Sequence, residues 1–237
     1  MLLEDVLQGG VDKILYLYYA KKGIKMTIIF MWDWDGTLAN TMPAHADLAA
    51  KCIQKHFGIN FQSAREQYLN TTGIPFDYQL KKIFPKEKES KIISCAEEYH
   101  KEKMTYVYEN PKEFPEALKV VKKLQDNENI YQTVSSSTEE GIINKWAQKN
   151  EIGIMVLGRE SGSKNDHIIE VRKWFPRSKI IFISDSHGDM SLPVEITLGV
   201  DVPSHKEQIF WDNGAHSVSF EPVNLKWLEE IKEFLVE

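Results

Sequence analysis

Asp33 and Asp35 stand two residues apart in the segment Asp33-Trp-Asp-Gly-Thr-Leu38, directly after the apolar run at residues 27–32. Residues two apart on a strand point to the same side, so the two carboxylates share one face. Two like charges held there repel each other unless a cation lies between them or one is protonated. A cation such as Mg²⁺ is coordinated by carboxylate oxygens. Alternatively, a carboxylate that faces a phosphate can attack the phosphorus and form an aspartyl-phosphate. Taken alone, the pair is equally consistent with a turn, because Asp and Gly are common turn residues.

A second acidic pair, Asp185 and Asp189, follows another apolar run at residues 179–184. In open α/β sheets, ligands bind outside the carboxyl ends of the strands. If the two apolar runs are neighbouring strands, three or four carboxylates meet at one edge of the sheet, and the sequence then predicts a metal there. A surface turn rich in Asp, Ser and Gly is the alternative, and the presence of the first pair makes it the weaker interpretation.

Groups that could hold a phosphate lie between the two acidic pairs. Ser135 and Ser136 belong to a run of hydroxyl side chains that follows the apolar segment 130–134 and opens a helical pattern. Hydroxyls and backbone N–H groups at a helix start bind anions, although the same residues also suit an ordinary helix cap. Ser135 is the preferred candidate because it directly follows the segment. Lys164 lies in a loop between a strand pattern and a helical pattern, where a lone lysine is commonly solvent-exposed.

Apolar runs alternate with amphipathic helical patterns along most of the chain. Short β-forming runs recur at residues 27–32, 130–134, 154–157, 179–184 and 196–200. Continuous apolar runs suit strands that are buried on both faces. The alternation therefore predicts an α/β fold with a Rossmann-like parallel sheet core and helices on both faces. A C-terminal helix is expected at residues 225–235, where leucine and isoleucine recur at helical spacing.

Residues 43–109 interrupt this alternation, since they contain helical patterns but no convincing strand. They predict an inserted, all-helical cap domain between the first and second strands. The core is then expected at residues 26–42 and 110–237. Residues 1–25 form an N-terminal extension, which is either an ordinary docking helix or a segment upstream of a natural start at Met26.

Taken in order, these segments resemble the haloacid dehalogenase superfamily of phosphotransferases. A strand with DxDGTL, a helical insert, a strand ending in Ser, a loop Lys and a strand followed by Asp-xxx-Asp together span residues 26–200. A DxDG alone is a weak signal, but the ordered set is specific. The insert looks like the small helical cap of the family's first cap class. That likeness rests also on the segments Asn40-Thr-Met-Pro-Ala-His45 and Thr72-Gly-Ile-Pro75.

The resemblance implies a role for each matching residue. Asp33 would attack phosphorus, and Asp35 would protonate the leaving oxygen and then activate water. The residues implied to hold the phosphoryl group are Thr37, Ser135, Ser136 and Lys164. A Mg²⁺ cofactor would be held by the metal residues Asp33, Asp35 (through its backbone carbonyl), Asp185 and Asp189, the last in a supporting position.

The implied activity is that of a Mg²⁺-dependent phosphatase hydrolysing a small phosphorylated metabolite through an aspartyl-phosphate. A sugar-phosphate mutase or other phosphotransferase would use the same core, and a non-catalytic binding or regulatory module would keep the fold without turnover. Asp35 counts against a dehalogenase, because the resembling dehalogenases lack this residue. Two departures from the family pattern stand out. Ser184 replaces the usual Gly, and the segment after Asp189 lacks the typical Ala-rich helix.

The bulk composition is that of an ordinary globular chain of 237 residues, 42% hydrophobic and 27% charged, with a formal net charge of −6. This charge argues against a nucleic-acid partner but not against a phosphorylated small molecule, since a local group of cations can outweigh it. No apolar run approaches the roughly 20 residues that a membrane helix needs. Neither the two cysteines nor the N-terminus carries a metal-binding or signal-peptide pattern. We therefore expect a cytoplasmic protein with no membrane partner, while its oligomeric state is not predicted.

Overall fold

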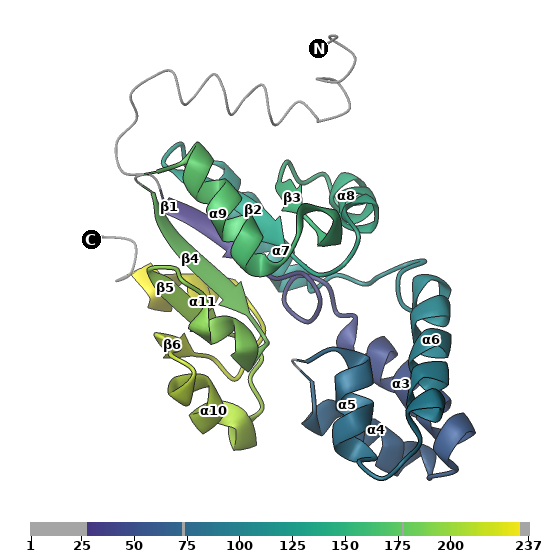
Figure 1. Cartoon of the computed structure of the whole chain (residues 1–237). Helices are drawn as coiled ribbons and strands as arrows, with labels where there is room; N and C mark the ends of the chain where they lie inside the picture. The colour runs from purple at the N-terminus through teal and green to yellow at the C-terminus, as the bar shows by residue number, and fades with distance from the viewer. Residues whose placement is uncertain (1–27, 73, 177, 233–237) are drawn as a thin grey trace. The chain divides into compact units, whose positions relative to one another are not determined.

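A computed structural model describes residues 28–72, 74–176 and 178–232, which form two compact units (Figure 1). Of the described residues, those up to Leu38 and from Glu113 onward form one unit, and those within Ala39–Lys112 form the other. The expected N-terminal extension, residues 1–25, lies outside the described residues.

The first unit is built on a sheet of six strands within the described residues, in the order β3-β2-β1-β4-β5-β6. The strands are β1 (Ile28–Trp32), β2 (Ile130–Ser135), β3 (Met155–Leu157), β4 (Lys179–Ser184), β5 (Ile196–Gly199) and β6 (Ser217–Val218). All neighbouring strands pair in parallel. Trp32 lies opposite Val134 on β2 and Ile183 on β4, so the three central strands end at almost the same level.

One face of the sheet is covered by α9 (Lys164–Trp174), which lies in front of the sheet in Figure 1. Ile168 and Val171 of this helix join a buried apolar cluster with Ile29 and Phe182 of the central strands. The amphipathic pattern of α9 therefore buries its apolar side against the sheet.

The opposite face is covered by α7 (Pro115–Gln125) and α11 (Leu225–Glu230). The rings of Trp32 and Trp227 lie 6.1 Å apart between centroids, and the side chain of Gln132 donates a hydrogen bond to the carbonyl of Val121. Since Ile29 and Trp32 face opposite sides, β1 is buried on both faces, as its continuous apolar run predicted. The predicted α/β fold with a parallel sheet and helices on both faces is confirmed.

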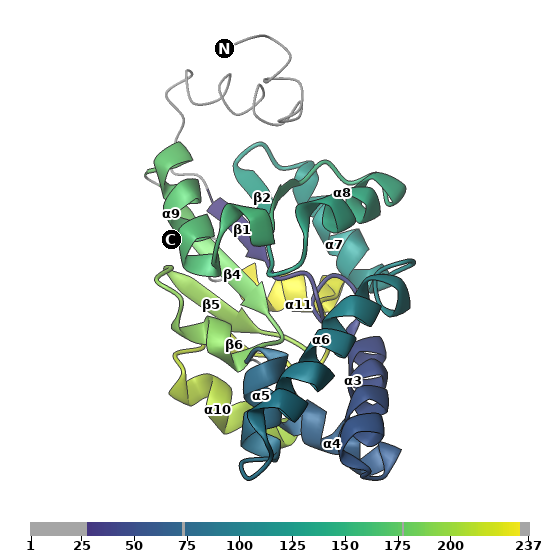
Figure 2. The ribbon, with the colours of Figure 1, turned by 45° about the vertical axis from the view of Figure 1, so that its right-hand side comes forward.

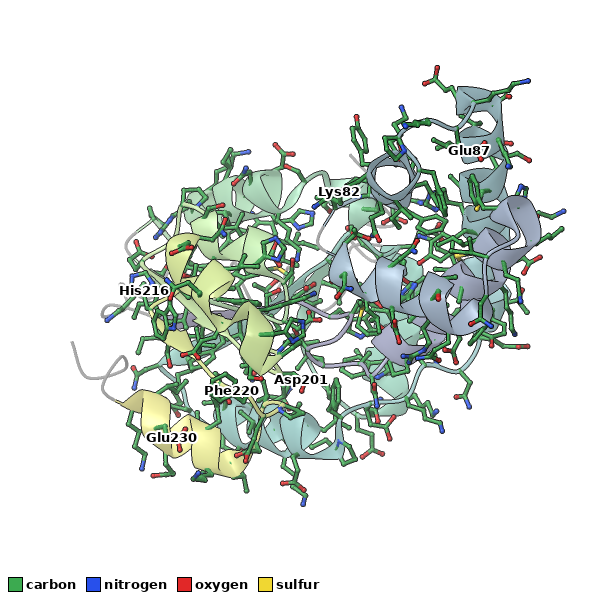
Figure 3. All side chains as sticks on the ribbon, turned by 90° about the horizontal axis from the view of Figure 1, so that it is seen from below. Lys82, Glu87, Asp201, His216, Phe220 and Glu230 are labelled. Atoms are coloured by element: carbon green, nitrogen blue, oxygen red, sulfur yellow. The ribbon has the colours of Figure 1, made fainter. Side chains whose placement is uncertain are left out.

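Two short elements at the β6 end of the sheet were not anticipated from the sequence. The strand β6 pairs with β5, and α10 (Glu207–Asp212) precedes it. Beyond the two strands, the N–H of Asp201 donates to the carbonyl of Glu221, and Asp201 and Phe220 lie close together when seen from below (Figure 3). The last helix, α11, ends at Glu230, short of the predicted end at residue 235, although residues 233–237 lie outside the described part.

The second unit is helical, and no strand occurs among its described residues. Its helices are α3 (Met42–Phe57), α4 (Phe61–Asn70), α5 (Phe76–Ile83) and α6 (Glu89–Tyr106). Figure 2 shows α3 beside α4 and α6, against both of which it packs. In neither unit do the described residues include a helix with the length and apolar character needed to cross a membrane.

His45, in the first turn of α3, is buried inside the helical unit. Its Nδ1 lies 2.6 Å from the hydroxyl of Tyr99, and its Nε2 lies 3.0 Å from the hydroxyl of Tyr108. A neutral imidazole has one donor and one acceptor nitrogen, which two tyrosine hydroxyls satisfy together. The histidine therefore joins the start of α3 to α6, through Tyr99, and to Tyr108 just beyond that helix.

Candidate active site

Asp33 lies directly after β1 at the carboxyl end of the central strand. Its N–H donates to the carbonyl of Ile183 across 2.8 Å, which continues the ladder between β1 and β4. The residue is only 7% exposed, and its Oδ1 accepts a hydrogen bond from the N–H of Trp34. Burial raises the pKa of Asp33 from 3.8 to about 6, against the lowering effect of Lys164. The strand end therefore holds a carboxyl group that is costly to ionise without a cation.

Lys164 is the first residue of α9, rather than a loop residue as the sequence suggested. The helix start is fixed by Ser163 and Asp166, which bond to each other's backbone N–H groups in a capping box. The Nζ atom of Lys164 lies 3.1 Å from Oδ2 of Asp33 and 2.5 Å from Oδ2 of Asp189. Burial alone would lower the pKa of Lys164, but the two carboxylates outweigh it and raise the pKa above its ordinary value. The lysine is therefore a fixed positive charge at Asp33.

The carboxylate of Asp185 lies against the turn that follows Asp35. Gly36 adopts a φ of +77°, and a Cβ atom there would lie 2.1 Å from Oδ2 of Asp185. The N–H of Asp185 donates to Oγ1 of Thr37, and this hydroxyl also lies 3.4 Å from Oδ1 of Asp185. Burial, followed by the charge of Asp33, raises the pKa of Asp185 well above its usual value. The predicted phosphate-binding Thr37 is thus placed at the acidic loop.

Asp189 is buried in a short 3₁₀ helix, His187–Ser191. Oδ2 of Asp189 lies 2.6 Å from the hydroxyl of Ser184, and this hydroxyl is also 3.1 Å from Oδ2 of Asp33. A glycine at position 184 could not make these contacts. Ser184 therefore links the two acidic motifs, a role that the sequence comparison with the usual glycine did not reveal.

Asp35 is partly buried and meets the loop after β2. Its Oδ2 accepts a hydrogen bond from the hydroxyl of Thr138 across 2.6 Å. The N–H of Thr138 in turn donates to Oγ of Ser136 across 3.1 Å. The loops that follow the two neighbouring strands are therefore joined at Asp35, and Thr138 is a contact that sequence reasoning missed.

Ser135 is fully buried at the end of β2, and its Oγ lies 2.8 Å from Nδ1 of His167. His167 lies one turn after Lys164 on α9, and its Nε2 is 2.9 Å from the carbonyl oxygen of Gly158. The sequence carried one signal for this histidine, its place three residues after a candidate site lysine. Nothing local indicated that Ser135 would face it.

The oxygen atoms of the site are suited to a hard cation such as Mg²⁺. Two carboxyl groups whose pKa is raised by burial, Asp33 and Asp185, lie next to each other, and Asp185 is pressed against the backbone at Gly36. Across residues 28–72, 74–176 and 178–232, no group of three or more His, Cys, Asp or Glu side chains is arranged to hold a metal.

The two acidic loops and the buried Lys164 lie at the carboxyl ends of the parallel strands, where ligands bind in open α/β sheets. A sequence model described as haloacid dehalogenase-like hydrolase matches residues 28–192. The chain belongs to this family of hydrolases. No curated protein sequence matches it significantly.

Solved structures with the same fold include three at 15–17% sequence identity. A haloacid dehalogenase-like family hydrolase from Streptococcus pneumoniae is 17% identical, with a TM-score of 0.64 over 88% of this chain and 98% of its own. A candidate beta-phosphoglucomutase from Bacteroides vulgatus is 16% identical, with a TM-score of 0.65 over 94% and 96%. A candidate phosphoglycolate phosphatase from Lactobacillus plantarum is 15% identical, with a TM-score of 0.63 over 86% and 99%. These likenesses show the fold.

Proposed function

We propose that this chain is a Mg²⁺-dependent phosphatase that hydrolyses a small phosphorylated metabolite through an aspartyl-phosphate intermediate. The observation that carries the proposal is the contact of Lys164 with Asp33, over 3.1 Å, at the carboxyl end of the central strand. A buried carboxylate beside a fixed cation is suited to face the negative charge of a phosphoryl group. Asp35, two residues on, supplies a second carboxyl group from the same strand end.

In the first step, a carboxylate oxygen of Asp33 attacks phosphorus, and the bond from phosphorus to the ester oxygen breaks. Asp35 gives its proton to the departing oxygen, which leaves as an alcohol. In the second step, the Asp35 carboxylate takes a proton from water as that water attacks phosphorus, and the bond to Asp33 breaks to release inorganic phosphate. Lys164 and one serine hydroxyl at the end of β2 hold the phosphoryl oxygens through both steps. The covalent intermediate divides one difficult displacement into two easier ones.

The Mg²⁺ ion would be held by the carboxylates of Asp33 and Asp185 and the backbone carbonyl of Asp35, with Asp189 in support. The bound ion would supply positive charge to the phosphoryl oxygens. Because both carboxyl pKa values are raised in the absence of a cation, a bound dication would favour their ionised forms.

The purified chain should hydrolyse p-nitrophenyl phosphate when Mg²⁺ is present. Removal of the metal with EDTA should abolish turnover, and so should Asp33→Asn, which keeps the shape of the side chain but not its nucleophilic charge. Turnover that survives Asp33→Asn would reject the assignment of the nucleophile.

Two alternatives use the same fold. A sugar-phosphate mutase would return the phosphoryl group to a second sugar hydroxyl, so it would convert a sugar monophosphate with little release of inorganic phosphate. A non-catalytic module would show no turnover on a panel of phosphoesters. A phosphoester panel would also identify the substrate.

The proposal further includes a cap role for residues 43–109, a cytoplasmic location and no nucleic-acid partner.

A further inference from the structure

The hydroxyl of Ser135 and the ring of His167 form a buried chain of hydrogen bonds with Gly158. Ser135 is 0% and His167 is 1% exposed. Nε2 of the ring lies 2.9 Å from the carbonyl of Gly158, and a carbonyl oxygen only accepts, so Nε2 carries the proton. Nδ1 of the neutral ring is then an acceptor, and Ser135 donates its single hydroxyl proton to it across 2.8 Å. This serine cannot donate to a phosphoryl oxygen while that bond exists.

Burial lowers the pKa of His167, which favours the neutral ring. The charged groups near the ring are Glu140, Asp166 and Lys164. For the neutral ring, the direction of the Ser135 hydroxyl follows from the two distances and the acceptor character of the Gly158 carbonyl.

Ser136 is placed differently. Its Oγ accepts a hydrogen bond from the N–H of Thr138, so the hydroxyl proton of Ser136 is not used in that bond. Thr138 holds Oδ2 of Asp35 through its own side chain, across 2.6 Å. The turn that contains Ser136 is therefore anchored at the carboxylate proposed to protonate the leaving oxygen.

We propose that Ser136, rather than Ser135, donates the serine hydrogen bond to the transferring phosphoryl group. In the same arrangement Ser135 and His167 form a tie that positions Lys164. This assignment rests on the proposed phosphatase function.

The tie acts on Lys164 through the first turn of α9, which carries both Lys164 and His167. Its other end is the loop at Gly158, which packs closely against Thr138, because a Cβ at position 158 would lie 2.7 Å from the carbonyl oxygen of that residue. His167 therefore fixes the helix start to the ends of both β2 and β3. His167 is a positioning residue, since it acts on the phosphoryl group only through Lys164.

Three alanine variants in the serine run test the assignment. Ser136→Ala should lower kcat/KM for p-nitrophenyl phosphate by about 10- to 100-fold, the range for a hydrogen bond to a charged group. Ser135→Ala should cost about threefold, and Ser137→Ala, at an exposed position, is the matched control and should change nothing. A larger loss in Ser135→Ala than in Ser136→Ala overturns the assignment.

Binding of inorganic phosphate, followed by ³¹P NMR, separates this assignment from the proposed function. Ser136→Ala should weaken phosphate binding about tenfold, and Ser135→Ala much less. If the wild-type chain binds phosphate with this ranking but hydrolyses no phosphoester, the function fails and the serine assignment holds. Equal or reversed ranking, or no binding by the wild type, overturns the assignment.

A double-mutant comparison tests the tie. His167→Phe removes both hydrogen bonds and should lower kcat about tenfold, while His167→Gln keeps a donor and an acceptor and should recover part of the loss. The double variant Ser135→Ala/His167→Phe should be no worse than His167→Phe alone, because both changes break the same bond. If the two losses multiply, the tie is rejected. ¹⁵N NMR of the ring gives a check that is independent of activity, since Nε2 should carry the proton and Ser135→Ala should shift the Nδ1 resonance.

Discussion

The hydroxyl of Thr138 donates a hydrogen bond to Oδ2 of Asp35 across 2.6 Å, and this contact joins the loops that follow β1 and β2. Asp35 is the group proposed to give and take a proton during turnover. A hydrogen bond to one carboxylate oxygen restricts rotation of the group and sets the direction of the other oxygen. We therefore expect Thr138 to affect proton transfer through the orientation of Asp35.

Thr138→Val keeps the shape of the side chain and removes this hydrogen bond. We expect kcat for p-nitrophenyl phosphate to fall about tenfold, which corresponds to about 1.4 kcal/mol, with little change in KM. Thr138→Ser retains a hydroxyl and should keep most of the activity. A rise in KM at unchanged kcat would show instead that Thr138 acts on substrate binding.

Gly36→Ala should damage the site more than an equivalent change elsewhere. Its φ of +77° disfavours alanine, and the added Cβ would lie 2.1 Å from Oδ2 of Asp185. Gly58, at the end of α3, has a φ of +73° and nothing within 4 Å of such a Cβ, so Gly58→Ala is a matched control for backbone strain alone. The control should cost about 1 kcal/mol of unfolding free energy, and Gly36→Ala roughly 1 to 3 kcal/mol more. Denaturant unfolding measures both changes in unfolding free energy. Equal changes would show that the Asp185 side chain moves away from the added Cβ at no cost.

The main elements of the sheet could be predicted because each leaves a local pattern. The run at β1 is apolar at consecutive positions, which is what burial on both faces requires. The strand β6 contains only Ser217–Val218, too short for any periodicity, and its pairing depends on β5 already being in place. The strand therefore depends on tertiary contacts, and no local sequence pattern predicts it.

In the site too, some features have a local sequence pattern and others depend on tertiary contacts. The position of Asp33 and Asp35 directly after an apolar run, and the order of the motifs along the chain, could be recognised from the sequence. The contacts of Ser184 with Asp33 and Asp189 could not, since a serine in place of glycine reads as a tolerated exchange. The bond between Ser135 and His167 joins residues 32 positions apart, and only the packing of α9 on the sheet brings them together.

The stabilising effect of Mg²⁺ should increase with pH. Burial raises the pKa of Asp33 from 3.8 to about 6, and that of Asp185 is also raised. Carboxyl groups with raised folded-state pKa values stabilise the fold when protonated, and that contribution is lost as pH rises from about 4 through about 6. Mg²⁺ binds the ionised carboxylates, so its shift of the melting temperature should be larger at about pH 7.5 than at about pH 5. Asp33→Asn should flatten the pH dependence of the metal-free protein, and a Mg²⁺ shift that is larger at the lower pH would contradict this account.

Lys164→Met should destabilise the fold as well as remove activity. The lysine Nζ is shared by Asp33 and Asp189, and its side chain is 20% exposed, so its loss leaves buried carboxylates without their cation. Breaking such a pair typically costs roughly 3–5 kcal/mol. Lys173→Met, on the same helix, removes an ion pair with Glu170 from a lysine that is 65% exposed, and it should cost less than about 0.5 kcal/mol. Urea unfolding of the two variants at neutral pH measures the difference. Because Lys164 lowers the pKa of Asp33, that pKa should lie above about 6 in Lys164→Met, and the deficit should shrink as pH falls toward about 6 and Asp33 becomes protonated in the variant. Equal stability of the two variants at neutral pH would show that the carboxylates at the end of β1 are compensated by something other than Lys164.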